Sequence, residues 1–183
     1  MNILIVGAGA VGLVYGQYFA RAGHRVTFFI KENHRAALEG GVVLVEKRRW
    51  RADRVSPVED FSLLWEWDEV ASQTWDQVVL AISSDALRAL PFDTVRPVTG
   101  DATGVMLQPS DADYVLLSEY WPAGHIVKGM INLISYYHPL PGEKPLDDPA
   151  AIKIAYFIPP TAMPLSGDSE RVIQTLALFR DSG

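Results

Sequence analysis

The chain has 183 residues, a length that suits a single globular domain. Hydrophobic residues make up 49% of it and charged residues 21%, and the formal net charge is −6. An ordinary packed core is therefore expected, whereas nucleic acid and anionic membranes are not expected as partners. The absence of cysteine excludes disulfides, thiol catalysis and cysteine-ligated metals. No apolar run approaches the ~20 residues that a transmembrane helix needs, and we expect a cytoplasmic protein.

A glycine motif follows an apolar strand predicted over residues 2–6. Its spacing is G-x-G-x-x-G. The first glycine permits a tight turn, the second lets the backbone approach a pyrophosphate, and the third lets the following helix pack closely. The free N–H groups at the start of that helix then face the phosphates. The residues expected to bind a dinucleotide in this loop are Gly7, Gly9, Ala10, Val11 and Gly12.

The context of the motif decides between a binding site and a bare glycine-rich turn. A helix is predicted over 11–20, ended by Ala22-Gly23, and a strand rich in β-branched and aromatic residues is predicted over 25–30. This complete strand–turn–helix–strand arrangement favours the dinucleotide site.

Strands and helices alternate along the rest of the chain. Further strands are predicted over 42–45, 50–55, 77–82, 104–107, 126–131, 133–137 and 152–158. Helices are predicted over 33–38, 86–90, 110–120 and 168–180. The alternation predicts an α/β fold, a Rossmann-type doubly wound and mostly parallel sheet with helices on both faces, with residues 1–183 as one domain.

Some local features of this assignment are more specific. The segment 50–55 is expected to pair antiparallel with 42–45, and Ser56-Pro57 to end it. Residues 60–74 read only as a loosely helical connection, and Pro91 is expected to stop the helix before it. The apolar stripe of the last helix is expected to comprise Val172, Leu176 and Phe179.

The end of the second strand indicates which dinucleotide binds. NAD sites place an Asp or Glu there, about 20 residues beyond the glycines, to bond the ribose hydroxyls. Here Lys31 lies 19 positions past Gly12 (31 − 12). A cation would attract a 2′-phosphate, which favours NADP(H). Glu32 is the alternative, but successive strand residues face opposite ways and the strand register favours Lys31.

Several stretches together resemble the ketopantoate reductases (2-dehydropantoate 2-reductases), an NADP-dependent family. They are residues 3–12, 23–26 with the basic Lys31, 34–41, 78–82, 104–108 and 158–160. The resemblance covers nearly the whole chain. It implies hydride transfer from NADPH to the ketone of a small 2-oxo acid such as 2-dehydropantoate.

The chain departs from the family pattern at positions that matter for chemistry. The family's lysine after the fourth-strand run is Ser83 here, and its Asn-Gly after Leu-Gln is Pro109-Ser110. Proline offers neither a side-chain donor nor an N–H, so Gln108 or Ser110 would have to substitute. By resemblance we assign Ser83 and Gln108 to the cofactor site.

The resemblance also places the catalytic lysine and the substrate-binding carboxylate in a helical C-terminal domain. The chain stops at Gly183, about where that domain would begin. We therefore expect the domain to be absent, assign no catalytic residue, and expect the 183-residue chain alone to be inactive.

Other functions remain open at this point. The chain could be a non-catalytic dinucleotide-binding or sensor module, or another hydroxy-acid or opine-type dehydrogenase that shares only the glycine motif. The acidic pairs Asp111/Asp113 and Asp147/Asp148 lack a third ligand at metal spacing, so we expect no metal site. His125 and His138 are read as structural. The aromatic residues expected in the core, or at an interface that a second copy could cover, are Trp65, Trp67, Trp75, Tyr136 and Tyr137.

Overall fold

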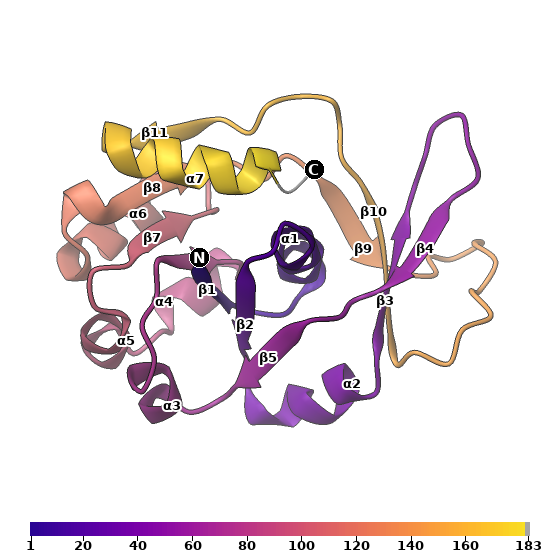
Figure 1. Cartoon of the computed structure of the whole chain (residues 1–183), viewed down its shortest axis with the longest axis horizontal. Coiled ribbons are helices and arrows are strands. Elements are labelled where there is room, and N and C mark those ends of the chain that lie inside the picture. The colour runs from indigo at the N-terminus through magenta and orange to yellow at the C-terminus, as the bar shows by residue number, and fades with distance from the viewer. Residues whose placement is uncertain (182–183) are drawn as a thin grey trace.

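A computed structural model of the chain describes residues 1–181; Ser182 and Gly183, the end of the predicted domain, lie outside the described residues. The larger of two sheets has seven strands in the order β11-β8-β7-β6-β1-β2-β5 (Figure 1). Its strands are β1 (Asn2–Val6), β2 (Arg25–Phe29), β5 (Phe61–Leu64), β6 (Gln77–Leu80), β7 (Thr103–Met106), β8 (Ile126–Gly129) and β11 (Leu165–Gly167).

The order of the strands is that of a doubly wound sheet. From β1 the chain moves outward through β2 to β5, and then returns to the other side of β1 to build β6, β7 and β8. These strands are all parallel, and only β11 at the edge runs antiparallel to its neighbour β8. The predicted Rossmann-type fold is therefore confirmed, with its switch point between β1 and β6.

Helices cover both faces of this sheet. On one face lie α1 (Ala10–Arg21) and α7 (Ser169–Asp181), and on the other α3 (Trp67–Ala71), α4 (Ser84–Arg88), α5 (Phe92–Thr99) and α6 (Asp111–Tyr120). Strand residues alternate between the two cores: Ile3 and Ile5 pack on the α1 face, Leu4 and Val6 on the opposite face. Burial on both faces explains why the central strands read as continuous apolar runs.

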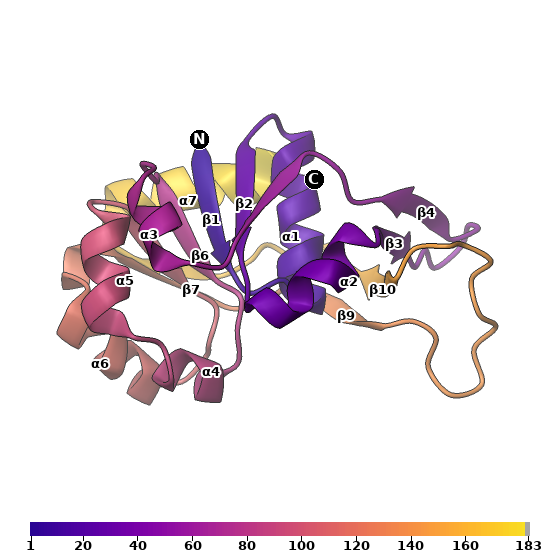
Figure 2. The same ribbon diagram turned by 90° about the horizontal axis from the view of Figure 1, so that it is seen from below.

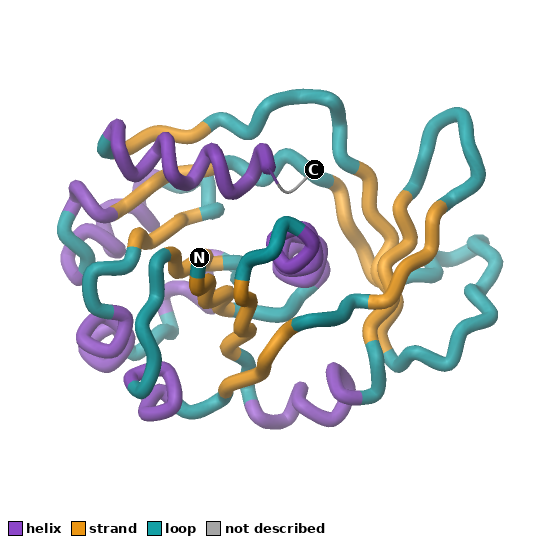
Figure 3. Tube along the Cα trace, viewed as in Figure 1, coloured by secondary structure: helices purple, strands orange, loops and turns teal. Residues whose placement is uncertain are grey.

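A second sheet was not predicted as a separate unit. It has four strands in the order β4-β3-β10-β9, namely β4 (Arg54–Pro57), β3 (Val42–Glu46), β10 (Ile152–Phe157) and β9 (Ile134–Tyr137). Short α2 (Arg35–Glu39), which follows a 3-10 turn at Glu32–His34, leads into it. Helix α1 lies between the two sheets (Figure 3), because residues of β3 and β10 join the same core as α1.

Three local expectations were wrong. Residues 60–74 contain strand β5 as well as helix α3. Ser56 and Pro57 still belong to β4, with Pro57 as its last residue, and a proline is tolerated there because β4 is an edge strand. Pro91 does follow the end of α4, as expected, and it also directly precedes α5. On α7, Leu176 is 39% exposed, and Thr175 and Leu178 take the buried positions.

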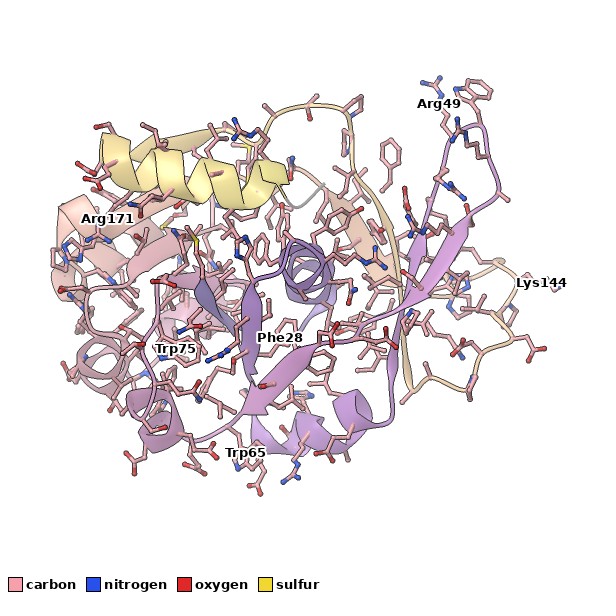
Figure 4. The ribbon with its side chains drawn as sticks, in the orientation of Figure 1. Phe28, Arg49, Trp65, Trp75, Lys144 and Arg171 are labelled. Atoms are coloured by element: carbon pink, nitrogen blue, oxygen red, sulfur yellow. The ribbon has the colours of Figure 1, made fainter. Side chains whose placement is uncertain are left out.

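The aromatic residues mostly serve the core, as expected. Trp75 is buried, and Trp67 stacks on Phe29 with ring centroids 3.7 Å apart. Trp65 packs beneath the guanidinium of Arg35, 4.4 Å from its ring centroid. Of the five aromatic residues expected in the core or at an interface, Tyr137 is the most exposed, at 59%. Figure 4 shows Trp75 inside the body of the molecule, whereas Arg49 projects from the tip of the β3–β4 hairpin.

Glu143 anchors the loop that follows β9. Its carboxylate accepts hydrogen bonds from Leu140 N at 2.8 Å and from Tyr136 Oη at 2.7 Å, and lies 3.1 Å from His138 Nδ1. These bonds, that of Leu140 first, hold the pKa of Glu143 down at about 2, below its ordinary 4.5. A depressed carboxyl pKa stabilises the fold above the ordinary value, and that stability is lost as the pH falls toward the folded value.

We expect Glu143→Gln to lower the urea midpoint at neutral pH. The difference from the unchanged chain should shrink as the pH falls from about 5 toward 2, because the native carboxylate is then protonated too. The measurement is urea unfolding across this pH range. Glu39→Gln, which removes an exposed ion pair with Arg35, is the matched control and should show little pH dependence. A constant difference for Glu143→Gln at all pH values would contradict this account.

Candidate functional site

The sequence-predicted site residues meet at one edge of the larger sheet. Strands β1, β2, β6 and β7 are parallel and in register, with Val6 beside both Phe29 and Leu80, so their carboxyl ends lie together (Figure 2). The loops that leave this edge carry Gly7–Gly12, Lys31, Ser83 and Gln108. In open α/β sheets this edge, at the switch point, is where ligands bind.

Two of the motif glycines are required by the packing of the protein itself. Gly7 has φ of +101°, and a Cβ there would come within 2.6 Å of Ile82 Cγ2 and 2.8 Å of Ala81 O. A Cβ on Gly12 would overlap the carbonyl oxygen of Gly7. These glycines therefore fix the turn and the close approach of α1 to the end of β1.

Gly9 differs from the other two. Its backbone is ordinary extended chain, with φ of −77°, and beyond its immediate chain neighbours no atom of the described residues lies within 4 Å of a Cβ built there. The fold therefore does not require glycine at this position. A glycine that faces open space is what a site needs where a ligand approaches the backbone closely.

The start of α1 is open to an anion. Gly9 is the N-cap and supplies no side chain, and the first turn contains no acidic residue. The helix begins with the bond from Leu13 N to Gly9 O at 2.9 Å, so the N–H groups of Ala10, Val11 and Gly12 precede the helical ladder. Such N–H groups, with the positive end of the helix dipole, favour a phosphate.

Lys31 lies where the sequence predicted it, just beyond β2. Ile30 is buried, so alternation turns Lys31 outward, and its side chain is exposed. Glu32 begins the 3-10 turn and is exposed too. Arg35 forms an ion pair with Glu39, with 2.7 Å between its Nε and Glu39 Oε1. Among the described residues Lys31 has no ion-pair partner, which leaves its ammonium available to a ligand.

Ser83 and Gln108 both make structural contacts at this edge. Ser83 is the N-cap of α4, and its Oγ accepts from Ala86 N at 3.2 Å. Gln108 is 5% exposed, and its Nε2 donates to Leu80 O at 3.1 Å and Ile82 O at 2.6 Å. Within residues 1–181, its Oε1 has no hydrogen-bond partner. The cofactor role assigned to these two residues stays a prediction.

The remaining candidate side chains lie away from the glycine loop or already bind other side chains of the protein. His125 precedes β8 and lies at the amino edge, and burial, with Arg171 nearby, lowers its pKa. His138 is held beside Glu143. Lys128, at the carboxyl end of β8, donates to Asp111 Oδ1 at 2.6 Å, and this bond lowers the pKa of Asp111. Among the described residues no group of three potential metal ligands occurs.

A cavity of about 760 Å³ lies on a different side of α1. Its lining includes Tyr15, Tyr18, Met163 and Phe179, and none of the predicted cofactor residues. Burial raises the pKa of Tyr15 to about 12, so its hydroxyl stays protonated and donates to Asn132 Oδ1 at 2.9 Å. This cavity is separate from the glycine loop.

A comparison with known protein families shows to which of them the chain belongs. The family described as "Ketopantoate reductase PanE/ApbA" matches residues 3–157. The chain belongs to this family. The resemblance inferred from the sequence is thus confirmed, and the fold is that of the NAD(P)-binding domain of ketopantoate-reductase-like oxidoreductases.

Solved structures support the fold. The chain is similar over its whole length to 2-dehydropantoate 2-reductase from Geobacter metallireducens GS-15, with 21% identity and a TM-score of 0.74, and covers 56% of that chain. It is likewise similar to D-mandelate dehydrogenase with NADH and anilino(oxo)acetate (15% identity, TM-score 0.68, 55% of that chain). NADP⁺-bound yersinopine dehydrogenase is similar with 12% identity and a TM-score of 0.65, and the chain covers 46% of it. The ketopantoate reductase homologue described here thus spans about half the length of these relatives.

No helix within residues 1–181 is long and apolar enough to cross a membrane.

We expect Gly9→Val to abolish NADPH binding and cost at most about 1 kcal/mol of stability, because its Cβ meets open space, the N-cap preference for glycine is modest, and the side chain enters the proposed phosphate site. The measurements are a fluorescence titration with NADPH and thermal unfolding.

Two substitutions provide the controls. Gly124→Val also enters open space, but at the amino edge, and should leave binding intact. Gly12→Ala should destabilise the fold by on the order of 1–3 kcal/mol through overpacking. Normal NADPH affinity in Gly9→Val would mean that this loop does not hold the phosphates.

Proposed function

We propose that the chain is the NADP(H)-binding domain of a ketopantoate-reductase-like oxidoreductase that reduces a small 2-oxo acid such as 2-dehydropantoate. The observation that carries the proposal is the combination of an open Gly9, an uncapped α1 and the outward Lys31 at one switch point. The family membership supports the same reading. We assign residues 1–183 to the cofactor domain and the substrate-holding groups to the helical domain of the family.

Each group at the edge has a separate part in this proposal. The N–H groups of residues 10–12 bind the pyrophosphate, and Lys31 binds the 2′-phosphate of the adenosine ribose. Because β2 and β6 flank β1 on opposite sides, the nicotinamide half extends toward β6 and β7. When bound, NADPH supplies the hydride for the ketone carbon. The chain's own residues orient the cofactor, with its adenosine half on the β2 side of β1 and its nicotinamide half on the β6 side.

A non-catalytic dinucleotide-binding module is the second candidate. Ser83 is committed to capping α4, Pro109 offers no donor, and the ammonium of Lys128 is paired with Asp111. At the carboxyl ends of the larger sheet's strands, few of the described residues are therefore left to donate a proton to an alkoxide. Turnover by the chain would exclude this second candidate, whereas both functions are compatible with an inactive 183-residue chain.

The cofactor preference tests the role of Lys31. The unchanged chain should bind NADPH more tightly than NADH, and Lys31→Glu should lower this affinity ratio by up to about thirtyfold, or reverse it. The reason is that an exposed charge pair contributes about 1 kcal/mol, and repulsion by the new carboxylate adds a similar amount. The measurement is parallel titration with both dinucleotides.

Lys144→Glu is the matched control, since it makes the same charge change on the outer loop visible in Figure 4. It should leave the NADPH/NADH ratio unchanged. Equal affinities in the unchanged chain, or tighter NADH, would assign the ribose contact to Glu32 instead.

We expect the 183-residue chain to turn over 2-oxo acids far below ~1 s⁻¹, an ordinary lower value for an enzyme. Alkoxide stabilisation and positioning each supply several kcal/mol of barrier lowering, and the described edge contributes few groups for either. The measurement follows NADPH oxidation with 2-dehydropantoate and a panel of 2-oxo acids. Turnover at or above that rate would place a complete catalytic set within these residues, with Lys128 the first to test.

A further inference from the structure

Asp113 is a fully buried carboxylate with two side-chain partners. It lies in the first turn of α6 at 0% exposure, and accepts from Ser84 Oγ at 2.5 Å and from Arg88 Nη2 at 2.8 Å. A buried carboxylate is costly unless it is paired and hydrogen-bonded, and here both oxygens are engaged. The two donors belong to α4, so the contact ties α6 to α4.

The same two segments are tied a second time, nearer the sheet. Gln108, in the loop before α6, donates to the carbonyls of Leu80 and Ile82 in the segment before α4. The segment after β7 therefore holds the loop after β6 (residues 81–83) directly, through Gln108 at Ile82, and indirectly, through Asp113 and α4. Both contacts join residues more than 20 positions apart in the chain.

Helix α4 depends on these contacts because little else holds it. It has five residues, of which only Leu87 is fully buried in the core. An isolated helix of this length is unstable, so tertiary contacts must supply its order. Without Asp113, loop 81–83 would be joined to a helix held mainly by one leucine.

This loop lies on one particular side of the glycine motif. Lys31 follows β2, and loop 81–83 follows β6, the neighbour of β1 on the opposite side. A dinucleotide whose pyrophosphate lies on β1 and whose adenosine lies toward β2 therefore has its nicotinamide half toward loop 81–83.

We infer that Asp113 is a positioning residue for the nicotinamide half of the cofactor. Through Ser84 and Arg88 it fixes loop 81–83 in the arrangement that the nicotinamide ribose and ring contact, and it has no part in holding the adenosine half. This inference rests on the proposed function and assigns a task to a residue that makes no direct contact with the cofactor.

The test compares NADPH with 2′,5′-ADP, which carries only the adenosine half. For Asp113→Ala we expect NADPH affinity to fall by on the order of tenfold, as when an orienting hydrogen-bond partner of a ligand-binding group is removed. Affinity for 2′,5′-ADP should not change. The fluorescence of bound NADPH should move toward that of the free cofactor, and amide exchange over residues 81–88 should rise.

Two further variants separate positioning from loss of folding. Asp113→Asn can still accept from Arg88 and donate to Ser84 Oγ, so it should restore most of the NADPH affinity. Ser84→Ala removes one partner at little cost in packing and should weaken NADPH binding selectively, but less than Asp113→Ala. It carries the test if Asp113→Ala does not fold.

Thr175→Val is the structural control. It removes a buried hydrogen bond, from Thr175 Oγ1 to Gln77 Oε1 at 3.1 Å, at the amino end of β6. It should lower the free energy of unfolding and leave the ratio of the NADPH and 2′,5′-ADP affinities unchanged. The inference is overturned if Asp113→Ala and Ser84→Ala bind NADPH normally, if they lose both ligands equally, or if Thr175→Val shows the same selective loss. Failure of the unchanged chain to bind either ligand would instead overturn the proposed function, and this inference with it.

Discussion

The close contact of α1 with the larger sheet is the constraint on which the rest of the structure depends. At Gly12 the helix backbone touches the carbonyl of Gly7, and at Gly16 it meets the ring of Phe28, so that a Cβ at either position would collide. Protein interiors are packed too densely to absorb such an atom without moving an element. The two glycines therefore set the distance of α1 from β1 and β2, and with it the position of the helix N-terminus.

The opposite side of α1 is fixed as well. Tyr18 Oη lies 3.2 Å from Tyr156 Oη of β10, and Gln17 Oε1 accepts from Glu59 N at 3.0 Å just after β4. The second sheet thus packs against the helix that the first sheet positions. A phosphate site at the start of α1 gains from this arrangement, because a preorganised anion site has less conformational entropy to lose on binding.

Local elements and the α/β fold class could be predicted from the sequence, whereas the individual pairings between distant strands and side chains could not. The glycine loop, α1, β2 and the outward Lys31 follow from local spacing and alternation. Strand β5 was missed because it has only four residues, in a segment read as helical. The second sheet was missed because its central pairing joins Val42 to Ile152, 110 positions apart (152 − 42). No local pattern encodes such a register.

Asp113 shows the same limit at the level of a single side chain. In the sequence it is one of two carboxylates in the first turn of a helix, where negative charge suits the dipole. In the structure the nearby Asp111 fits that description, because it is exposed. Asp113 is instead buried, and it binds Arg88 and Ser84, which lie 25 and 29 positions away in the chain. The two halves of the proposed cofactor site therefore differ in origin. The adenosine side depends on a contiguous stretch of chain, and the nicotinamide side depends on contacts between separate loops. Because the latter can vary without any change in the glycine motif, members of this fold can share a phosphate site and differ in the reaction they support.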